Sequence, residues 1–234
     1  MKSFLLPIQK LLQHFLFGRH CAGCKAPGTA LCERCFTRIP PAEATEHAHI
    51  YGMVTYAHPL VHDALWGLKY HHRGTVAQAI TKYCGPIVQE LIADILIDTE
   101  HSTVVFVPIP QYKDKQHTRG FNQSAAIAAW LSENTDIPVK DLLEKKYHTT
   151  PQAKIQKRMD RFYNIAGVFT IKDTVTVQEN TLYVLIDDVT TTGATLLEGM
   201  NAFKKAGALH VIGIALAHGY KNCGTGEIRT LGRV

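Results

Sequence analysis

The amino-acid sequence predicts an α/β protein in which a central, mostly parallel sheet is flanked by helices. Three short apolar runs rich in β-branched residues, at 104–107, 182–186 and 209–216, are typical of strands covered on both faces. Segments whose apolar residues recur at helical spacing lie between these runs, and strand–helix–strand repetition is the pattern of a parallel sheet. With 234 residues, of which 46% are hydrophobic, the chain can form one full domain and a small appendage.

The N-terminal residues 1–17 predict an amphipathic helix that docks on the body of the protein. The apolar residues that recur there at helical spacing are Leu5, Ile8, Leu12 and Phe15. Polar residues split the apolar stretches and no small-residue cleavage site follows, which argues against a secretory signal. No uninterrupted apolar run approaches the roughly 20 residues that cross a bilayer. We therefore expect a soluble, cytoplasmic protein with no membrane insertion.

Two Cys-x-x-Cys pairs follow, formed by Cys21, Cys24, Cys32 and Cys35. Such pairs bring four thiolates around one ion, and tetrahedral Zn²⁺ takes four such ligands in closed structural sites. The alternative of two disulfides is disfavoured in a reducing cytosol, and a redox motif would consist of a single pair. The spacing therefore predicts a structural zinc site within an N-terminal domain, residues 1–45, that also contains the first helix.

The remaining elements are predicted from apolar spacing: a strand at 51–56 and helices at 59–68, 75–97 and 121–131. We expect the helix at 75–97 to be interrupted at Gly85-Pro86, because proline cannot continue the backbone hydrogen-bond ladder. A further helix follows the strand at 182–186, and Gly207 is expected to end it.

The apolar strand at 182–186 delivers two carboxylates, Asp187 and Asp188, and a threonine-rich loop follows them. A loop at the carboxyl end of a parallel strand lies where α/β sheets bind ligands. Its small residues let N–H groups and hydroxyls close around a phosphate, and the next helix adds the partial positive charge of its N-terminus. Carboxylates would repel that phosphate, so we expect them at the exposed end of the strand, serving sugar hydroxyls or a hydrated divalent metal. A 5-phosphorylated ribose has this layout.

A polar turn in which Asp188 or a threonine merely caps the helix is the simpler interpretation of this loop. The cap interpretation explains one residue, but it does not explain why two acids, four threonines and a glycine follow one another in this segment. The segment also lacks the Gly-x-x-x-x-Gly-Lys pattern of a Walker loop and the spaced glycines of a dinucleotide fold. A phosphoribosyl ligand therefore remains the favoured prediction.

Residues 184–196 resemble the signature with which type I phosphoribosyltransferases bind 5-phosphoribosyl-1-pyrophosphate (PRPP). Further landmarks are Leu68-Lys-Tyr70, Val107-Pro-Ile-Pro110, Arg119-Gly-Phe-Asn-Gln123, Gln152, Arg158 and Arg161-Phe-Tyr-Asn164. Together with the cysteine pairs, these landmarks make most of the chain resemble the ComF (competence protein F) family, called ComFC in some bacteria. The residues after Gly219 lie outside the resemblance, and we treat 221–234 as a C-terminal tail.

The resemblance implies a type I phosphoribosyltransferase fold for residues 46–220 and binding of PRPP with Mg²⁺. It implies that Asp187 and Asp188 meet the ribose diol, and that Arg119 and Gly120 form the pyrophosphate loop. The phosphate loop would consist of Thr190, Thr191, Thr192, Gly193, Ala194 and Thr195. The implied role is in natural transformation. The protein would act there on incoming single-stranded DNA in the cytoplasm, at the inner face of the membrane, with proteins of the DNA-uptake machinery.

Basic residues leave two kinds of function open. Lys154, Arg158 and Arg161 are spaced at i, i+4 and i+7, so on a helix they would form one cationic stripe, with Lys157 beside it. The stripe is either a solvated helix face or part of a nucleic-acid site. The net charge of +5 suits a phosphate-bearing ligand or nucleic acid and selects neither.

The first possibility is a PRPP-dependent enzyme, in nucleotide salvage or metabolism, with no direct DNA role. In that enzyme Asp187 and Asp188 would orient the ribose, and Arg119 would stabilise the departing pyrophosphate. The second is a protein that binds PRPP as a ligand and grips single-stranded DNA. The two possibilities differ in whether a pocket exists for the nucleophile that would accept the phosphoribosyl group, and the sequence has no recognisable pattern for such a pocket.

Overall fold

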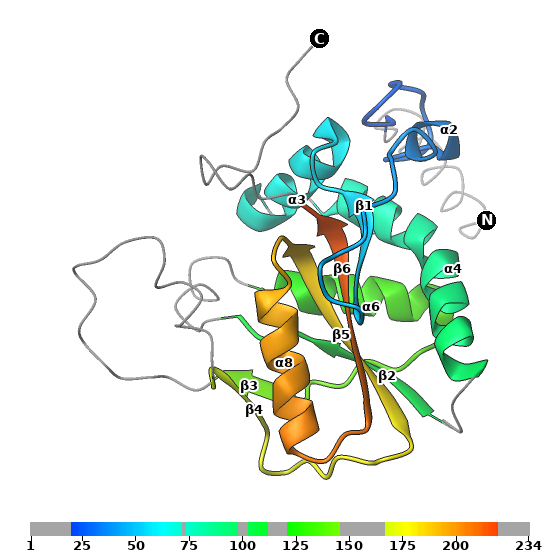
Figure 1. Ribbon diagram of the computed structural model, residues 1–234. Helices are drawn as coiled ribbons and strands as arrows, with labels where there is room; N and C mark the ends of the chain where they lie inside the picture. Colours follow the sequence, from blue (N-terminus) through cyan, green and yellow to red (C-terminus); the bar gives the residue numbers. More distant parts are fainter. Residues whose placement is uncertain (1–19, 72–73, 98–102, 112–120, 146–166, 220–234) are drawn as a thin grey trace, which may run out of the picture.

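A computed structural model describes residues 20–71, 74–97, 103–111, 121–145 and 167–219 (Figure 1). Within these residues a four-stranded sheet forms the centre, and its strand order is β1-β6-β5-β2. All neighbouring strands in this sheet are parallel. The four strands are β1 (Ile50–Thr55), β2 (Thr103–Pro108), β5 (Thr181–Thr190) and β6 (His210–His218). The predicted α/β class with a parallel sheet is confirmed.

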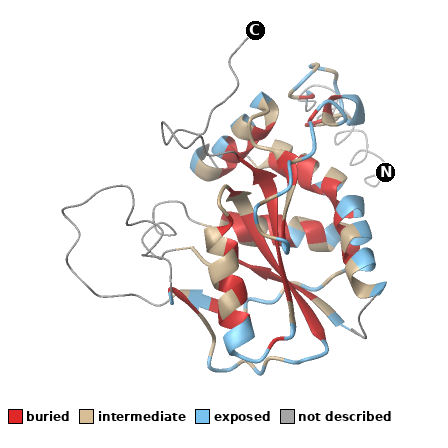
Figure 2. Ribbon diagram, viewed as in Figure 1, coloured by how far each residue is buried: buried red, intermediate tan, exposed pale blue. Residues whose placement is uncertain are grey.

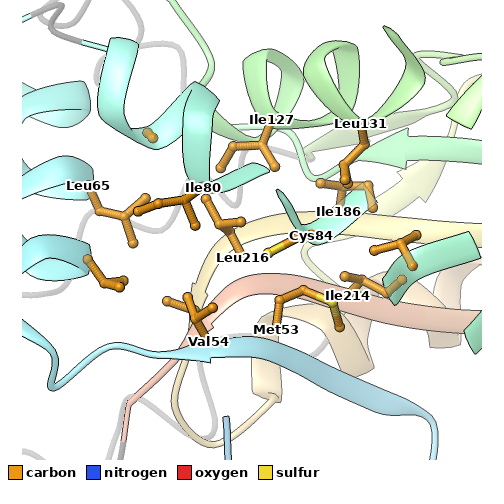
Figure 3. Close-up of a cluster of buried hydrophobic side chains, with 14 of the residues drawn as sticks. Met53, Val54, Leu65, Ile80, Cys84, Ile127, Leu131, Ile186, Ile214 and Leu216 are labelled. Carbon is orange, nitrogen blue, oxygen red and sulfur yellow. The ribbon is translucent and has the colours of Figure 1, made fainter. Parts of the chain in front are cut away.

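Helices cover both faces of this sheet, which is why most residues of its central strands, β5 and β6, are buried (Figure 2). One face carries α3 (Pro59–His71), α4 (Thr75–Ile97) and α6 (Gln123–Thr135), and the other carries α8 (Ala194–Lys205). Successive side chains of β5 point to opposite faces, so Ile186 joins the first layer and Leu185 the second. Figure 3 shows the first layer, where Ile80 and Cys84 of α4 meet Ile127 of α6.

The prediction that the helix at 75–97 breaks at Gly85-Pro86 is wrong, because α4 continues through Pro86. Pro86 lies on the exposed side of the helix, where the loss of one backbone N–H is least costly. The turns on either side are held by packing, since Ile80 and Val88 are fully buried. Gly85 faces Asn134 of α6, and a Cβ there would lie 3.1 Å from the Asn134 Cβ.

Other differences from the sequence-based expectation lie at the ends of elements. Strand β5 reaches Thr190, so both aspartates belong to the strand itself. A small antiparallel pair, β3 (Leu143–Lys145) and β4 (Phe169–Ile171), was not predicted and lies beside α8. Helix α8 ends at Lys205, and Gly207 follows with a φ of 94°, as expected for a helix stop.

The cysteine segment contains a short helix, α2 (Glu33–Phe36), and packs on α4. The rings of Phe36 and Tyr83 are stacked with centroids 4.7 Å apart. The Tyr83 hydroxyl donates a hydrogen bond to the Leu31 carbonyl oxygen at 3.3 Å. These contacts join the cysteine segment to the hydrophobic layer under α4.

Residues 40–42 then run beside the edge strand β1 and lead the chain into the sheet. Pro41 forms an antiparallel bridge with Val54, and the Ala42 N–H donates to the Met53 carbonyl oxygen at 3.2 Å. The predicted N-terminal helix at 1–17 and the tail at 221–234 lie outside the described residues. No helix in the described part of the chain has both the length and the apolar character needed to span a bilayer.

Candidate functional site

The four predicted zinc ligands come together in the structure. The Sγ atoms of Cys21, Cys24, Cys32 and Cys35 all lie within 4.8 Å of one another. The Sγ atom of Cys32 is 3.6 Å from that of Cys21 and 3.7 Å from that of Cys24. Four sulfur donors at these separations can hold a metal ion such as zinc, and they are the donor set of closed structural sites.

Local backbone geometry brings the cysteines together. The Cys21 N–H donates to the Ala26 carbonyl oxygen at 2.8 Å, and Lys25 adopts a left-handed conformation with a φ of 63°. A Cβ at Gly23 would lie 2.7 Å from the Cys35 Sγ, so a side chain there would push into the cluster.

Hydrogen bonding prepares one of these thiols for ionisation, and burial opposes ionisation in another. A hydrogen bond from the backbone at Ala26 and one from the Arg34 side chain lower the pKa of Cys24. Burial and the neighbouring cysteines raise the pKa of Cys35 to about 12. Four thiolates this close would repel one another, and a cation bound among them would offset that repulsion.

The phosphate loop predicted at 190–195 comprises the last residue of β5, residues 191–193 and the first two residues of α8, at the carboxyl edge of the sheet. Gly193 is the N-cap of α8 and has a φ of 72°, a conformation that favours glycine. A Cβ at Gly193 would also lie 2.7 Å from the Cδ2 atom of His47. The Leu197 N–H bonds to the Gly193 carbonyl oxygen at 2.8 Å, so the N–H groups before it lack intrahelical acceptors. The loop therefore has the features of an anion-binding helix N-terminus.

The two aspartates of β5 lie at the same edge but in different environments. Asp187 is only 9% exposed, and its Oδ1 accepts hydrogen bonds from the Ser124 Oγ at 3.0 Å and the Asp188 N–H at 2.9 Å. Asp188 is partly exposed, and its Oδ1 accepts from the Val189 N–H at 2.9 Å. Burial and then the negative charge of Asp188 raise the pKa of Asp187 to about 8. Asp188 thus offers an accessible charge, whereas Asp187, expected at the exposed end of the strand, is enclosed.

Several residues at this edge were missed by the sequence analysis. Tyr56, which follows β1, has its pKa raised by burial and by the negative charge of Asp188, so its hydroxyl lies within electrostatic reach of that carboxylate. His47 and His218 contact the loop from two other segments. Ser124 directly follows the Arg119–Gln123 motif, and this position was the one feature of the sequence that could have identified it as a site residue.

Other predicted site residues lie outside the described part of the chain: Arg119, Gly120, Lys154, Lys157, Arg158 and Arg161. The end of the Arg119–Gln123 motif is described. Asn122 caps α6, accepting from the Ser124 N–H at 3.0 Å and donating to the Ile109 carbonyl oxygen at 2.9 Å. The motif therefore ends at the junction of β2 and α6, beside the aspartates.

The fold and this edge define an α/β protein that gathers its polar groups at the carboxyl ends of parallel strands, with a four-cysteine cluster at its N-terminal side. The resemblance to the ComF family is confirmed by two curated relatives. Competence protein F of Haemophilus influenzae is 32% identical over 114 residues, covering 47% of this chain and 49% of the relative. Competence protein ComFC of Streptococcus pneumoniae is 37% identical over 106 residues, covering 45% and 44%. Each match thus spans about half the length of the relative.

Solved structures that align with this chain include a phosphoribosyltransferase and an amidotransferase. A hypoxanthine-guanine phosphoribosyltransferase of Bacillus anthracis aligns with a TM-score of 0.39 at 15% identity, covering 66% of this chain and 79% of that chain. Glutamine PRPP amidotransferase of B. subtilis aligns with a TM-score of 0.37 at 17% identity, covering 62% and 27%. No protein-family model matches the chain. Because both TM-scores are below 0.5, the assignment of a ligand depends on the site itself.

Proposed function

We propose that this chain is a PRPP-binding, phosphoribosyltransferase-like protein of natural transformation that acts on incoming single-stranded DNA in the cytoplasm. One observation carries the proposal: the loop at 190–195, the free N-terminus of α8 and the accessible carboxylate of Asp188 share one edge of the sheet. The names of the two curated relatives support the competence role.

The loop and the carboxylate suit opposite ends of one ligand. The 5-phosphate would lie on the loop, against the N-terminus of α8, where backbone N–H groups favour an anion. The ribose hydroxyls would face Asp188, because a carboxylate accepts hydrogen bonds from a diol and repels the phosphate. Asp187 would support this arrangement through Ser124 and the Asp188 backbone rather than by open exposure.

Mg²⁺ would enter with PRPP, as the counterion of its pyrophosphate, and zinc would occupy the four-cysteine cluster as a structural ion. The residues predicted to meet the pyrophosphate are Arg119 and Gly120, next to the described end of their motif. The zinc site supplies no open position for a substrate.

Calorimetry with Mg²⁺-PRPP on the full chain tests the proposal. Asp188→Asn should lower PRPP affinity at least about tenfold, because it removes the charged acceptor of the ribose hydroxyls. It should leave the affinity for inorganic phosphate unchanged or raised, because phosphate does not reach the diol position. Glu179→Gln is the matched control, since it removes one exposed negative charge at the amino end of β5. Equal PRPP affinity in wild type and Asp188→Asn would contradict the proposal.

Release of pyrophosphate decides whether binding is followed by transfer. Wild-type protein is incubated with Mg²⁺-PRPP and, in turn, with bases, nucleotides and single-stranded DNA. Acceptor-dependent pyrophosphate, lost in Asp188→Asn, would identify a phosphoribosyltransferase. PRPP binding without any acceptor-dependent release would favour the binding protein.

A further inference from the structure

Two histidines from separate segments each contact a carbonyl oxygen of the phosphate loop. The Nε2 atom of His47, in the segment before β1, is 3.1 Å from the Thr192 carbonyl oxygen. The Nε2 atom of His218, at the end of β6, is 3.2 Å from the Thr191 carbonyl oxygen. A carbonyl oxygen only accepts hydrogen bonds, so these contacts are hydrogen bonds when the Nε2 atom of each ring carries the proton.

These bonds fix the direction of the neighbouring N–H groups. In a planar trans peptide, the N–H of one residue points away from the C=O of the residue before it. The described residues contain no cis peptide bond. Each histidine therefore holds one carbonyl towards its own ring, and the N–H of the same peptide group, that of Thr192 or Gly193, points away from that ring. N–H groups turned away from the rings are available to donate to an oxyanion.

Both rings are themselves held in place. His218 is only 7% exposed, and its Nδ1 lies 3.0 Å from the Glu43 carbonyl oxygen. Because its Nε2 faces the Thr191 carbonyl oxygen, both contacts of His218 are hydrogen bonds when the ring carries both protons. A Cβ at Gly52 would lie 2.5 Å from the His218 Cβ, so glycine makes room for that side chain. The backbone of His47 is bound on both sides, by Thr45 Oγ1 and by the Ile50 N–H. Gly193 leaves space for the His47 ring.

We propose that His47 and His218 are positioning residues that preset the 191–193 peptide groups for an oxyanion. The inference rests on the proposed function, because it describes how the same loop receives its phosphate. Neither ring would touch the ligand, since each acts through the carbonyl that it holds. The loop would meet the ligand with its donors already aligned and little reorganisation at the moment of binding.

Paired Phe and Gln substitutions at His47 separate the hydrogen-bond donor from the bulk of the ring. Gln can place an N–H close to the position of the histidine Nε2, whereas Phe keeps the ring volume and has no donor. His47→Phe and His218→Phe should each weaken inorganic phosphate and Mg²⁺-PRPP binding roughly five- to tenfold, the effect of one lost hydrogen bond. His47→Gln should recover most of that loss. His49→Phe, an exposed histidine of the same segment, is the control and should bind as wild type does.

Amide ¹H–¹⁵N spectra of the ligand-free protein test whether His47 positions the peptide groups of the loop. The Thr192 and Gly193 signals should move in ligand-free His47→Phe and return towards their wild-type positions in His47→Gln. Equal behaviour of the Phe and Gln variants, in binding or in these signals, would overturn the inference. If the wild-type protein bound neither phosphate nor PRPP, the proposed function would fail. The ligand-free spectra would then still test whether the histidines position the loop.

Discussion

Replacing Asp187 by Asn should remove a pH dependence from the stability of the protein. The Asp187 carboxyl is enclosed, and its pKa is raised from 3.8 to about 8 by burial and by Asp188. Between these values the folded protein keeps a proton that the unfolded chain has released. Stability from this group is therefore complete below the unfolded pKa and is lost as the pH rises towards 8.

The magnitude follows from the same two pKa values. Each pH unit in this window costs at most about 1.4 kcal/mol, so wild type should lose about 2 kcal/mol between pH 6 and pH 7.5. Asn stays neutral and keeps an oxygen that can accept from Ser124 and from the Asp188 N–H. Asp187→Asn should lack this decline and should be more stable than wild type at pH 7.5.

Urea unfolding at pH 6.0, 6.75 and 7.5, with constant ionic strength and zinc present, measures the difference. A loss of about 2 kcal/mol corresponds to a fall of roughly 1 M in the wild-type midpoint. Asp188→Asn is the informative second variant. Removing the negative charge beside Asp187 should make the loss of stability between pH 6 and pH 7.5 smaller in this variant than in wild type. Parallel declines in wild type and Asp187→Asn would refute the assignment of the retained proton to Asp187.

The remaining predictions concern the metal and the nucleic acid. Purified protein should contain one zinc per chain, measured by metal analysis, and changing the four cysteines to serine should unfold the segment around them, because the ion contributes folding energy directly. A zinc-free protein with an intact fold would speak against the site. Neutralising Lys154, Arg158 and Arg161 together should weaken single-stranded DNA binding. A salt titration should show that the slope of log affinity against log salt concentration falls by roughly 0.7 per lost phosphate contact. An unchanged slope would exclude these residues from the DNA site, and loss of PRPP affinity alone would assign them to pyrophosphate.

Local patterning made the centre of the fold predictable from the sequence. β5 and β6 are buried on both faces, so their residues form continuous apolar runs that need no knowledge of neighbours. The cysteine pairs were predictable for the same reason, because spacing within each pair already brings two sulfurs together. The loop after β5 is equally local, since its glycine, its threonines and the start of α8 are adjacent in the chain.

What the sequence left open depends on contacts between distant residues. Asp187 is enclosed because Ser124, 63 positions away, bonds to it, and no periodicity reveals such a pair. β3 and β4 are three residues each and form only by pairing across a long intervening segment, as Leu143 does with Ile171. His47 lies in a polar stretch with no pattern, and its role follows only from the ring meeting Thr192, 145 positions away.

The segment from Cys35 to His47 joins the cysteine cluster to the phosphate loop by a short, continuous backbone. Along it, the Thr55 N–H bonds to Pro40, and the Ala42 N–H bonds to Met53, before His47 reaches Thr192. A ligand that held Thr192 in place would thus be linked to the cysteines through this backbone. If binding at one site changed the affinity of the other, reciprocity would make the two factors equal: a metal that tightened the ligand about tenfold would itself be tightened about tenfold by the ligand.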